Sequence, residues 1–295
     1  MLNVPFSQAV NPKSRLQNSR SMRLWGAIAA LAVSLPAMPA QALPWGDILR
    51  QGVQVLQFSN LSPQNEVALG NQLHANLLQQ GMKPYPNSTV NAYVNRVGQR
   101  LIARSGGERD YPYIFQVVQD SAVNAFATMG GRVYVTTGLL KAADNEAELA
   151  SVLGHEIGHI KDRHLVKQIR QRALTSGIIS SAGLSRNQAA NIGTELLVNR
   201  PKGRGDEYEA DQIGLEILRR ADYSTAAAPA FMKKLLRSGG GTPTFLSTHP
   251  AVPDRLKALE RAIQSGPENE CDRNPRQQSC GLDNQAYQNA IRQRL

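Results

Sequence analysis

The segment that most constrains how this chain can fold is the pentapeptide His-Glu-Ile-Gly-His at residues 155–159. Its two histidines, His155 and His159, are four residues apart, so on an α-helix their imidazoles lie on one face and can reach the same ion. Glu156 lies about 100° around such a helix, where it can act as a general base beside the ion. The pattern therefore predicts a helix that carries a metal-dependent hydrolytic site.

The sequence ahead of the pentapeptide favours a helix. Asn145 and Glu148 have the spacing of a capping box, in which two side chains satisfy the first free N–H groups of a helix. Apolar residues then recur at helical spacing up to Ile157. We predict one helix that begins at Asn145 and contains both histidines; the alternative is an ordinary amphipathic helix with two surface histidines.

A catalytic zinc site needs a third protein ligand and an open fourth position. Metzincins place a glycine and a third histidine after the pentapeptide, but this chain has Asp162 and Leu165 at those places. His164 is five residues after His159, about 140° away from its face if the helix continues. We therefore favour a structural role for His164.

The best candidates for the third ligand lie in the acidic segment 206–211. Glu207 and Asp211 share one helix face, so one carboxylate could bind zinc while the other orients a ligand histidine. The alternative is a solvated helix start, where the helix dipole favours acidic residues. His249 lies in Thr-His-Pro at 248–250, ahead of a predicted helix that contains Arg255; read alone, such a histidine is usually a cap or a packed residue.

The remaining pattern predicts an α+β fold with a helical majority. Alternating apolar residues indicate strands at 111–118, 122–128 and 132–136, and Gly130 and Gly131 permit a hairpin between the last two. Residues 176–204 have no clear pattern, and we interpret them as a mobile cover of the site. Apolar periodicity predicts further helices over residues 63–80, 88–106, 137–143, 166–174, 206–220, 229–236 and 253–263.

The first 42 residues have the order of a signal peptide. Arg20 and Arg23 precede an apolar run at 24–35, and the segment ends in Ala-Gln-Ala at 40–42. The run is too short to span a bilayer as a helix. We expect an exported protein of the periplasm or an equivalent compartment, with a catalytic domain at 43–265. Retention as an uncleaved anchor is the alternative, and the long charged region suggests that translation starts at Met22.

The net charge of +10 overstates the charge of the mature chain. Residues 1–42 contain Lys13, Arg15, Arg20 and Arg23 and no acid, so 29 basic and 23 acidic residues remain, a balance of +6. Such a surface could contact anionic membranes peripherally, or simply be solvated. No nucleic-acid motif accompanies it, and we expect no nucleic-acid partner.

The chain has two cysteines, Cys271 and Cys280, both in the polar segment 266–295. In an exported protein, an even pair at this spacing indicates a disulfide that closes a short loop. We interpret the segment as a C-terminal tail tethered by that bond; two free thiols are the alternative.

Four segments in order resemble the zinc metallopeptidases that include HtpX, BepA, the mitochondrial Oma enzyme and the CAAX prenyl endopeptidase. They cover roughly residues 65–265. They are Asn-Ala-Phe-Ala at 124–127 with Gly-Gly-Arg-Val-Tyr-Val at 130–135, the pentapeptide with Arg163 and His164, Glu207 with Ala210 and Asp211, and Thr-His-Pro at 248–250 with Arg255.

The resemblance implies one Zn²⁺ per chain, with Glu207 as third ligand and Asp211 supporting a ligand histidine. It implies that His249 can approach the zinc or stabilise the reacting oxyanion, with Arg255 assisting. It also implies a minigluzincin-like domain with a small antiparallel sheet whose edge strand flanks the helix of the pentapeptide. That edge strand, formed by Arg132, Val133, Tyr134 and Val135, would align a substrate peptide by strand addition. Asn124 is expected to bind the substrate as well.

The expected function is zinc-dependent endopeptidase activity on unfolded or misassembled envelope proteins. The chain shows no transmembrane helix beyond the signal and leaves only about 30 residues after Ile263, so we expect a compact exported member of the family without helical repeats. The alternative is an envelope chaperone or adaptor with a structural or latent zinc site. Glu156 argues against it, because a structural site needs no general base; a fourth position closed by His249 would favour latency.

Overall fold

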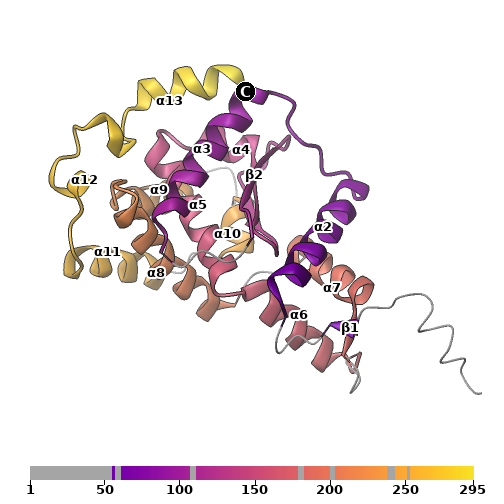
Figure 1. Cartoon of the computed structure of the whole chain (residues 1–295). Helices are drawn as coiled ribbons and strands as arrows, with labels where there is room; N and C mark the ends of the chain where they lie inside the picture. The colour runs from indigo at the N-terminus through magenta and orange to yellow at the C-terminus, as the bar shows by residue number, and fades with distance from the viewer. Residues whose placement is uncertain are drawn as a thin grey trace, which may run out of the picture. The chain divides into compact units, whose positions relative to one another are not determined.

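The computed structural model describes residues 55–56, 61–106, 111–178, 183–199, 203–237, 243–250 and 253–295 (Figure 1). The expected signal peptide at residues 1–42 lies outside them. Within the described residues helices predominate around small sheets, which confirms the predicted α+β class with a helical majority. No helix in this part of the chain is long and apolar enough to cross a membrane.

The helices predicted from apolar periodicity are present, with ends shifted by a few residues. They are α2 (Pro63–Gln79), α3 (Ser88–Arg104), α4 (Thr137–Ala142), α5 (Glu146–Lys161), α6 (His164–Thr175), α8 (Arg204–Arg220), α9 (Ala227–Arg237) and α11 (Pro253–Ser265). Further short elements were not predicted. They are α10 (Thr244–Thr248), α12 (Glu270–Arg273), α13 (Asn284–Ala290), the 3-10 helices η1 (Gln278–Cys280) and η2 (Arg292–Arg294), and an antiparallel pair of β1 (Val55–Leu56) and β5 (Leu184–Ser185).

The segment interpreted as a mobile cover contains a regular helix, α7 (Arg186–Asn199). Its small residues Ala189, Ala190 and Gly193 are buried, and a side chain at Gly193 would meet Leu73 of α2. Helix α7 thus packs through these small residues together with Ile192 and the partly buried Leu196, a pattern with few large apolar residues. That is why the apolar pattern in the sequence did not reveal it.

The main sheet has three strands in the order β2 (Ile114–Val118), β4 (Arg132–Thr136), β3 (Ala125–Ala127). β3 and β4 form the predicted antiparallel hairpin, and its turn contains Gly130 at φ 66° and Gly131 at φ 80°. These are left-handed conformations that glycine adopts readily. β2 pairs with β4 in parallel, so the sheet is mixed.

The expectation that residues 132–135 form an edge strand is wrong. Arg132, Val133, Tyr134 and Val135 lie in the middle strand, with β2 on one side and β3 on the other. The chain leaves β2, forms β3 and returns through the hairpin into the space between them. The outer strand of the hairpin is therefore β3. Alternation in the sequence identifies strands without identifying their neighbours.

Helix α5 is the centre of the core. Every residue from Ala147 to Ile160 is buried, as expected of a helix covered on all sides. The side chain of Asn145 caps it by accepting the N–H of Glu148 at 3.0 Å. The return bond of the predicted capping box is shifted, because Glu148 Oε2 accepts the N–H of Asp144 at 2.8 Å.

Helices α5 and α8 approach each other closely because glycines face the contact. A Cβ on Gly158 would lie 2.8 Å from the carbonyl oxygen of Ala210, and one on Gly214 would lie 2.9 Å from the backbone nitrogen of His155. Both distances are too short for a side chain. The two helices therefore meet backbone to backbone, at the turns that carry the candidate ligands.

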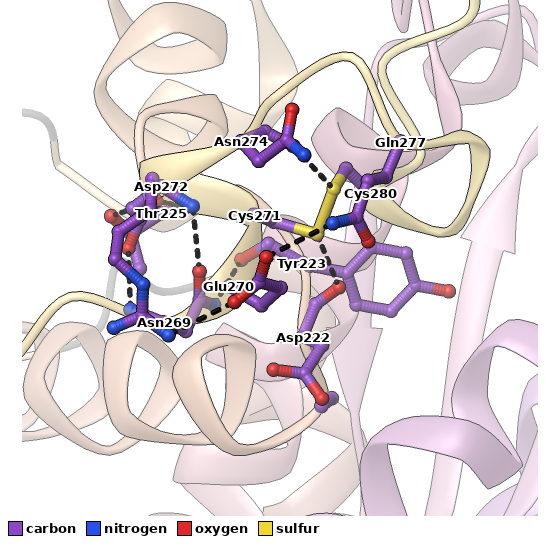
Figure 2. Close-up of a disulfide and its surroundings, with 12 residues drawn as sticks. Asp222, Tyr223, Thr225, Asn269, Glu270, Cys271, Asp272, Asn274, Gln277 and Cys280 are labelled. Atoms are coloured by element: carbon purple, nitrogen blue, oxygen red, sulfur yellow. Dashed lines mark hydrogen bonds and ion pairs between the residues drawn. A yellow bond between two sulfur atoms is a disulfide. The ribbon is translucent and has the colours of Figure 1, made fainter.

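The C-terminal segment is folded against the core rather than trailing from it. Cys271 and Cys280 form the predicted disulfide, and Figure 2 shows it beside Asp222 and Tyr223. After it, the carbonyl of Gly281 accepts the N–H of Ala147 in the first turn of α5 at 2.9 Å. In α13, which returns to α3 (Figure 1), the buried Tyr287 donates to the carbonyl of Leu140 at 3.0 Å and packs on Tyr93 of α3.

Candidate metal centre

The close contact of α5 with α8 brings the three predicted ligands together. Nε2 of His155 lies 3.1 Å from Nε2 of His159. Glu207 Oε1 lies 3.3 Å from His159 Nε2, and Oε2 lies 3.5 Å from His155 Nε2. All three side chains are buried. Two imidazoles and a carboxylate 48 positions later therefore converge on one point.

The spacing of these donor atoms fits zinc. Zinc binds nitrogen and oxygen ligands at about 2.0–2.2 Å, which places neighbouring donors of a tetrahedral site about 3.3 Å apart. The 3.1 Å between the two Nε2 atoms and the 3.3 Å from His159 Nε2 to Glu207 Oε1 match that edge length, and the 3.5 Å contact of His155 Nε2 is with the other oxygen, Oε2. Glu207 Oε1 is buried and accepts no well-aligned hydrogen bond from the described residues. Its environment suits an ion better than a network of neutral donors.

His249 occupies the place of a fourth donor. Its Nδ1 lies 3.1 Å from His155 Nε2 and 3.3 Å from Glu207 Oε1, and its ring is fully buried. It follows directly after α10, and the ring stacks on Phe245 with centroids 4.5 Å apart. Nε2 of His249 faces Glu156 Oε1 at 3.3 Å. His155, Glu156, His159 and His249 therefore form one buried group of potential ligand atoms.

Arg255 connects two carboxylates of the site. Its Nε and Nη2 donate to both oxygens of Asp211 at 2.8 and 2.7 Å, and its Nη1 donates to Glu207 Oε2 at 2.6 Å. Nη1 also donates to the carbonyls of His249 and Pro250 at 3.3 and 3.0 Å. The buried guanidinium is thus directed at the two carboxylates and at the backbone of His249 and Pro250.

Asp211 in turn holds the first histidine, because its Oδ1 lies 3.0 Å from His155 Nδ1. Burial opposes protonation of His155, but Asp211 and Glu207 outweigh it and raise the pKa of His155 to about 9. Burial would raise the pKa of Glu207; the neighbouring imidazoles, His249 foremost, instead hold that pKa well below its ordinary range. The site therefore favours an ionised Glu207 beside positively charged groups.

The sequence reading missed the contact that His164 makes. Its Nδ1 lies 2.7 Å from Nδ1 of His159, and its Nε2 lies 2.8 Å from Asp162 Oδ2 and 3.1 Å from Glu209 Oε2. The 140° estimate assumed a continuous helix, but Arg163 adopts a left-handed conformation at φ 57° and α6 begins anew at His164. The break turns the ring of His164 back under His159.

This arrangement permits a single consistent placement of protons. If Nε2 of His159 binds an ion, its proton sits on Nδ1 and can be donated to Nδ1 of His164. His164 then carries its own proton on Nε2 and donates it to Asp162 or Glu209. Each histidine of the pentapeptide thus has a partner on its far nitrogen, Asp211 for His155 and His164 for His159.

Of the residues expected to bind substrate, one lies at the candidate metal centre and four lie away from it. Asn124 accepts a bond from Thr248 Oγ1 at 3.3 Å and borders the hollow that contains His159 and His249. Leu196 and Leu197 of α7 line the same hollow, so part of the expected cover does lie at the site. The four residues of β4 lie elsewhere: Arg132 bonds Asn71, Tyr134 bonds His74, and Val133 and Val135 are in the core.

Residues 88–263 match peptidase family M48. The beta-barrel assembly-enhancing protease of Yersinia pestis is 32% identical over 266 residues, which cover 84% of this chain and 53% of that protein. The mitochondrial metalloendopeptidase OMA1 of Arabidopsis thaliana is 36% identical over 150 residues, 50% of this chain and 30% of that protein. The metalloprotease YcaL of Escherichia coli is 30% identical over 187 residues, 58% of this chain and 72% of that protein.

The chain spans about half the length of the beta-barrel assembly-enhancing proteases that it matches. The family match covers more than half of this chain and includes the pentapeptide, Glu207, Asp211, His249 and Arg255. The resemblance drawn from the four sequence segments is thereby confirmed. This chain belongs to peptidase family M48, a family of zinc metallopeptidases.

Proposed function

We propose that His155, His159 and Glu207 hold one zinc ion and that Glu156 is the general base of peptide hydrolysis. The observation that supports this most directly is that three buried side chains meet here, with the two Nε2 atoms 3.1 Å apart and each within 3.3–3.5 Å of one oxygen of the Glu207 carboxylate. When bound, zinc would act as a Lewis acid: it would polarise a peptide carbonyl and lower the pKa of water, so that the water loses its proton near neutral pH and becomes a nucleophile.

Glu156 lies beside this centre and not among its three ligands. Its fully buried carboxylate can take a proton from the attacking water and deliver it to the leaving amine. His249 faces Glu156 from the fourth position, so water and substrate can enter only when His249 moves aside. We propose that the displaced imidazole then offsets negative charge on the reacting carbonyl oxygen.

In this proposal Arg255 and Asp211 act through the ligands. Arg255 fixes Glu207 and Asp211 by three bonds of 2.6–2.8 Å, and Asp211 orients His155. Because its donors are directed at carboxylates and at two carbonyls, Arg255 positions the site rather than touching the substrate, which differs from the role that the resemblance suggested.

The proposed substrates are extended polypeptides that pair with β3. In the register of β3 with β4, Phe126 is hydrogen-bonded to Tyr134, so the N–H and C=O groups of Ala125 and Ala127 point away from β4 to the outer edge of the sheet. Both alanines are buried in this structure, so in this proposal the peptide pairs with them once the segment that carries His249 moves aside. Backbone pairing holds a peptide with little dependence on its sequence. Such recognition suits unfolded or misassembled proteins. Because the expected signal peptide would direct this chain to the cell envelope, we propose that its substrates are envelope proteins.

A second function is favoured by one observation. His249 closes the fourth donor position in this structure, as a latent site in an envelope chaperone or adaptor would require. Glu156 at the centre favours the protease, because a latent metal site has no use for a buried general base.

The test is the variant Glu156→Gln in the purified mature chain. We expect it to keep one zinc per chain and to cleave unfolded casein at least about 100-fold more slowly than wild type, the usual contribution of a general base. Equal rates would refute the proposed mechanism. Binding of unfolded casein without zinc-dependent cleavage, in wild type and in His249→Ala alike, would favour the chaperone or adaptor. Proteomics of cleaved envelope proteins in cells with either form would identify the substrates.

A further inference from the structure

A second hollow lies next to the one that faces the metal centre. We call the first the metal hollow, because His159 and His249 line it, and the second the apolar hollow. The two hollows share part of their lining beside β3. The residues common to both are Asn124, Phe126, Leu197 and Thr248.

The apolar hollow is built by side chains from separate elements. Its volume of about 540 Å³ lies within the range of specific ligand pockets. Phe126 is stacked on the buried Tyr134, with centroids 4.8 Å apart, so the floor is fixed. Polar residues such as Lys83 and Asp120 also border it. The apolar residues that line it are Leu77, Met82, Val118, Phe126, Leu197 and Val198.

The register of β3 connects this hollow to the substrate. Ala125 and Ala127 are buried in the main core with α5, whereas Phe126 packs on the opposite face with Leu77 and Tyr134. A polypeptide added to the outer edge of β3, as the proposed function has it, alternates in the same way, with every second side chain on each face. Side chains on the Phe126 face of that strand would enter the apolar hollow.

We propose that the apolar hollow is a substrate subsite that takes a large apolar side chain of the polypeptide bound to β3. This inference rests on the proposed function, and it adds a requirement that a substrate must meet. Folded proteins bury most of their large apolar side chains. A protease that needs one such side chain in an extended segment beside the cleaved bond therefore acts on unfolded chains and spares folded ones.

The experiment uses peptides with a fixed cleavage site in which each flanking position carries Leu, Phe, Ala or Ser in turn. We expect one position at which Ala in place of Leu lowers kcat/KM by at least about 10-fold, the low end of the range for one methylene in an apolar pocket. Leu197→Ser and Val198→Ser should reduce that ratio. Leu236→Ser is the matched control, because Leu236 is 45% exposed on α9 and does not line the hollow.

Binding of the same peptides to Glu156→Gln, followed by fluorescence anisotropy, gives the preference independently of turnover. An apolar preference that both hollow variants weaken and the control retains supports the subsite. Zinc-dependent cleavage with no apolar preference, or with a preference that Leu197→Ser and Val198→Ser leave intact, overturns the subsite alone. Absence of zinc-dependent cleavage overturns the proposed function and the subsite with it.

Discussion

Replacing Arg255 by methionine should destabilise the fold more than any surface substitution of an arginine. The guanidinium is 2% exposed and makes three bonds of 2.6–2.8 Å to Glu207 and Asp211, whose exposures are 0% and 9%. Its removal leaves two buried carboxylates without the guanidinium that bonds both, so that only the neighbouring imidazoles offset their charge. Breaking a buried ion pair from one side costs about 3–5 kcal/mol, so we expect a loss of that size in the free energy of unfolding.

The loss should depend on zinc. Without metal, Glu207 keeps its charge with no compensation from Arg255, whereas bound zinc neutralises part of it. The free energy of unfolding is obtained from denaturant titrations in chelator and in zinc. If the denaturant slope is unchanged by the substitution, the shift of the midpoint gives the loss in each condition. In thermal unfolding, about 3–5 kcal/mol corresponds to a fall of roughly 6–20 °C for a protein of this size. We expect the larger fall in chelator.

Two further variants sharpen this test. Arg220→Met is the matched control, because the half-exposed Arg220 pairs with Glu216 on the surface of α8, where an ion pair contributes at most about 1 kcal/mol. Adding Asp211→Leu to Arg255→Met should recover part of the stability by removing one uncompensated charge. A loss below about 1 kcal/mol for Arg255→Met, or no recovery in the double variant, would refute the reasoning.

Three other predictions follow from the contacts around α5. His164→Leu should weaken zinc affinity by about 10–100-fold in a chelator competition, as is usual when the partner of a ligand histidine is lost. His164→Gln, whose amide can accept from one side and donate to the other, should restore much of it; equal affinities for Leu and Gln would contradict the orienting role. Gly158→Ala should lower stability by about 1–3 kcal/mol through overpacking against α8, whereas Gly205→Ala, which meets nothing within 4 Å, should change it by less than about 1 kcal/mol in a denaturant titration. Replacing Cys271 and Cys280 together by serine should cost roughly 2–3 kcal/mol, the entropic value for a loop closed by residues nine apart; unchanged thermal unfolding would show that the bond does not hold the segment that caps α5.

The metal centre was the part of the molecule most open to prediction from the sequence. His155 and His159 lie on one helix, and helical geometry alone places them together. The spacing of Glu207 and Asp211 indicated their shared face in the same way. That α8 lies against α5 did not follow from any local pattern. It follows from Gly158 and from glycine in α8, which let the two backbones approach.

The errors have a common physical origin. The place of β4 between two strands, the packing of α7 through small residues and the return of Tyr287 to the core all depend on long-range contacts. Local periodicity does not encode such contacts. The contact of His164 with His159 depends on a single left-handed residue, Arg163. The sequence does not predict this conformation, because arginine rarely adopts it.

The most direct test is to locate the metal. We expect the purified mature chain to hold one zinc per chain, and anomalous scattering from its crystals to place the ion within about 2.0–2.2 Å of His155 Nε2, His159 Nε2 and a Glu207 oxygen. Loss of zinc in His159→Ala would agree. A chain that takes up no divalent metal, or an ion held elsewhere with Glu207 remote from it, would contradict the convergence of these three side chains on one catalytic centre.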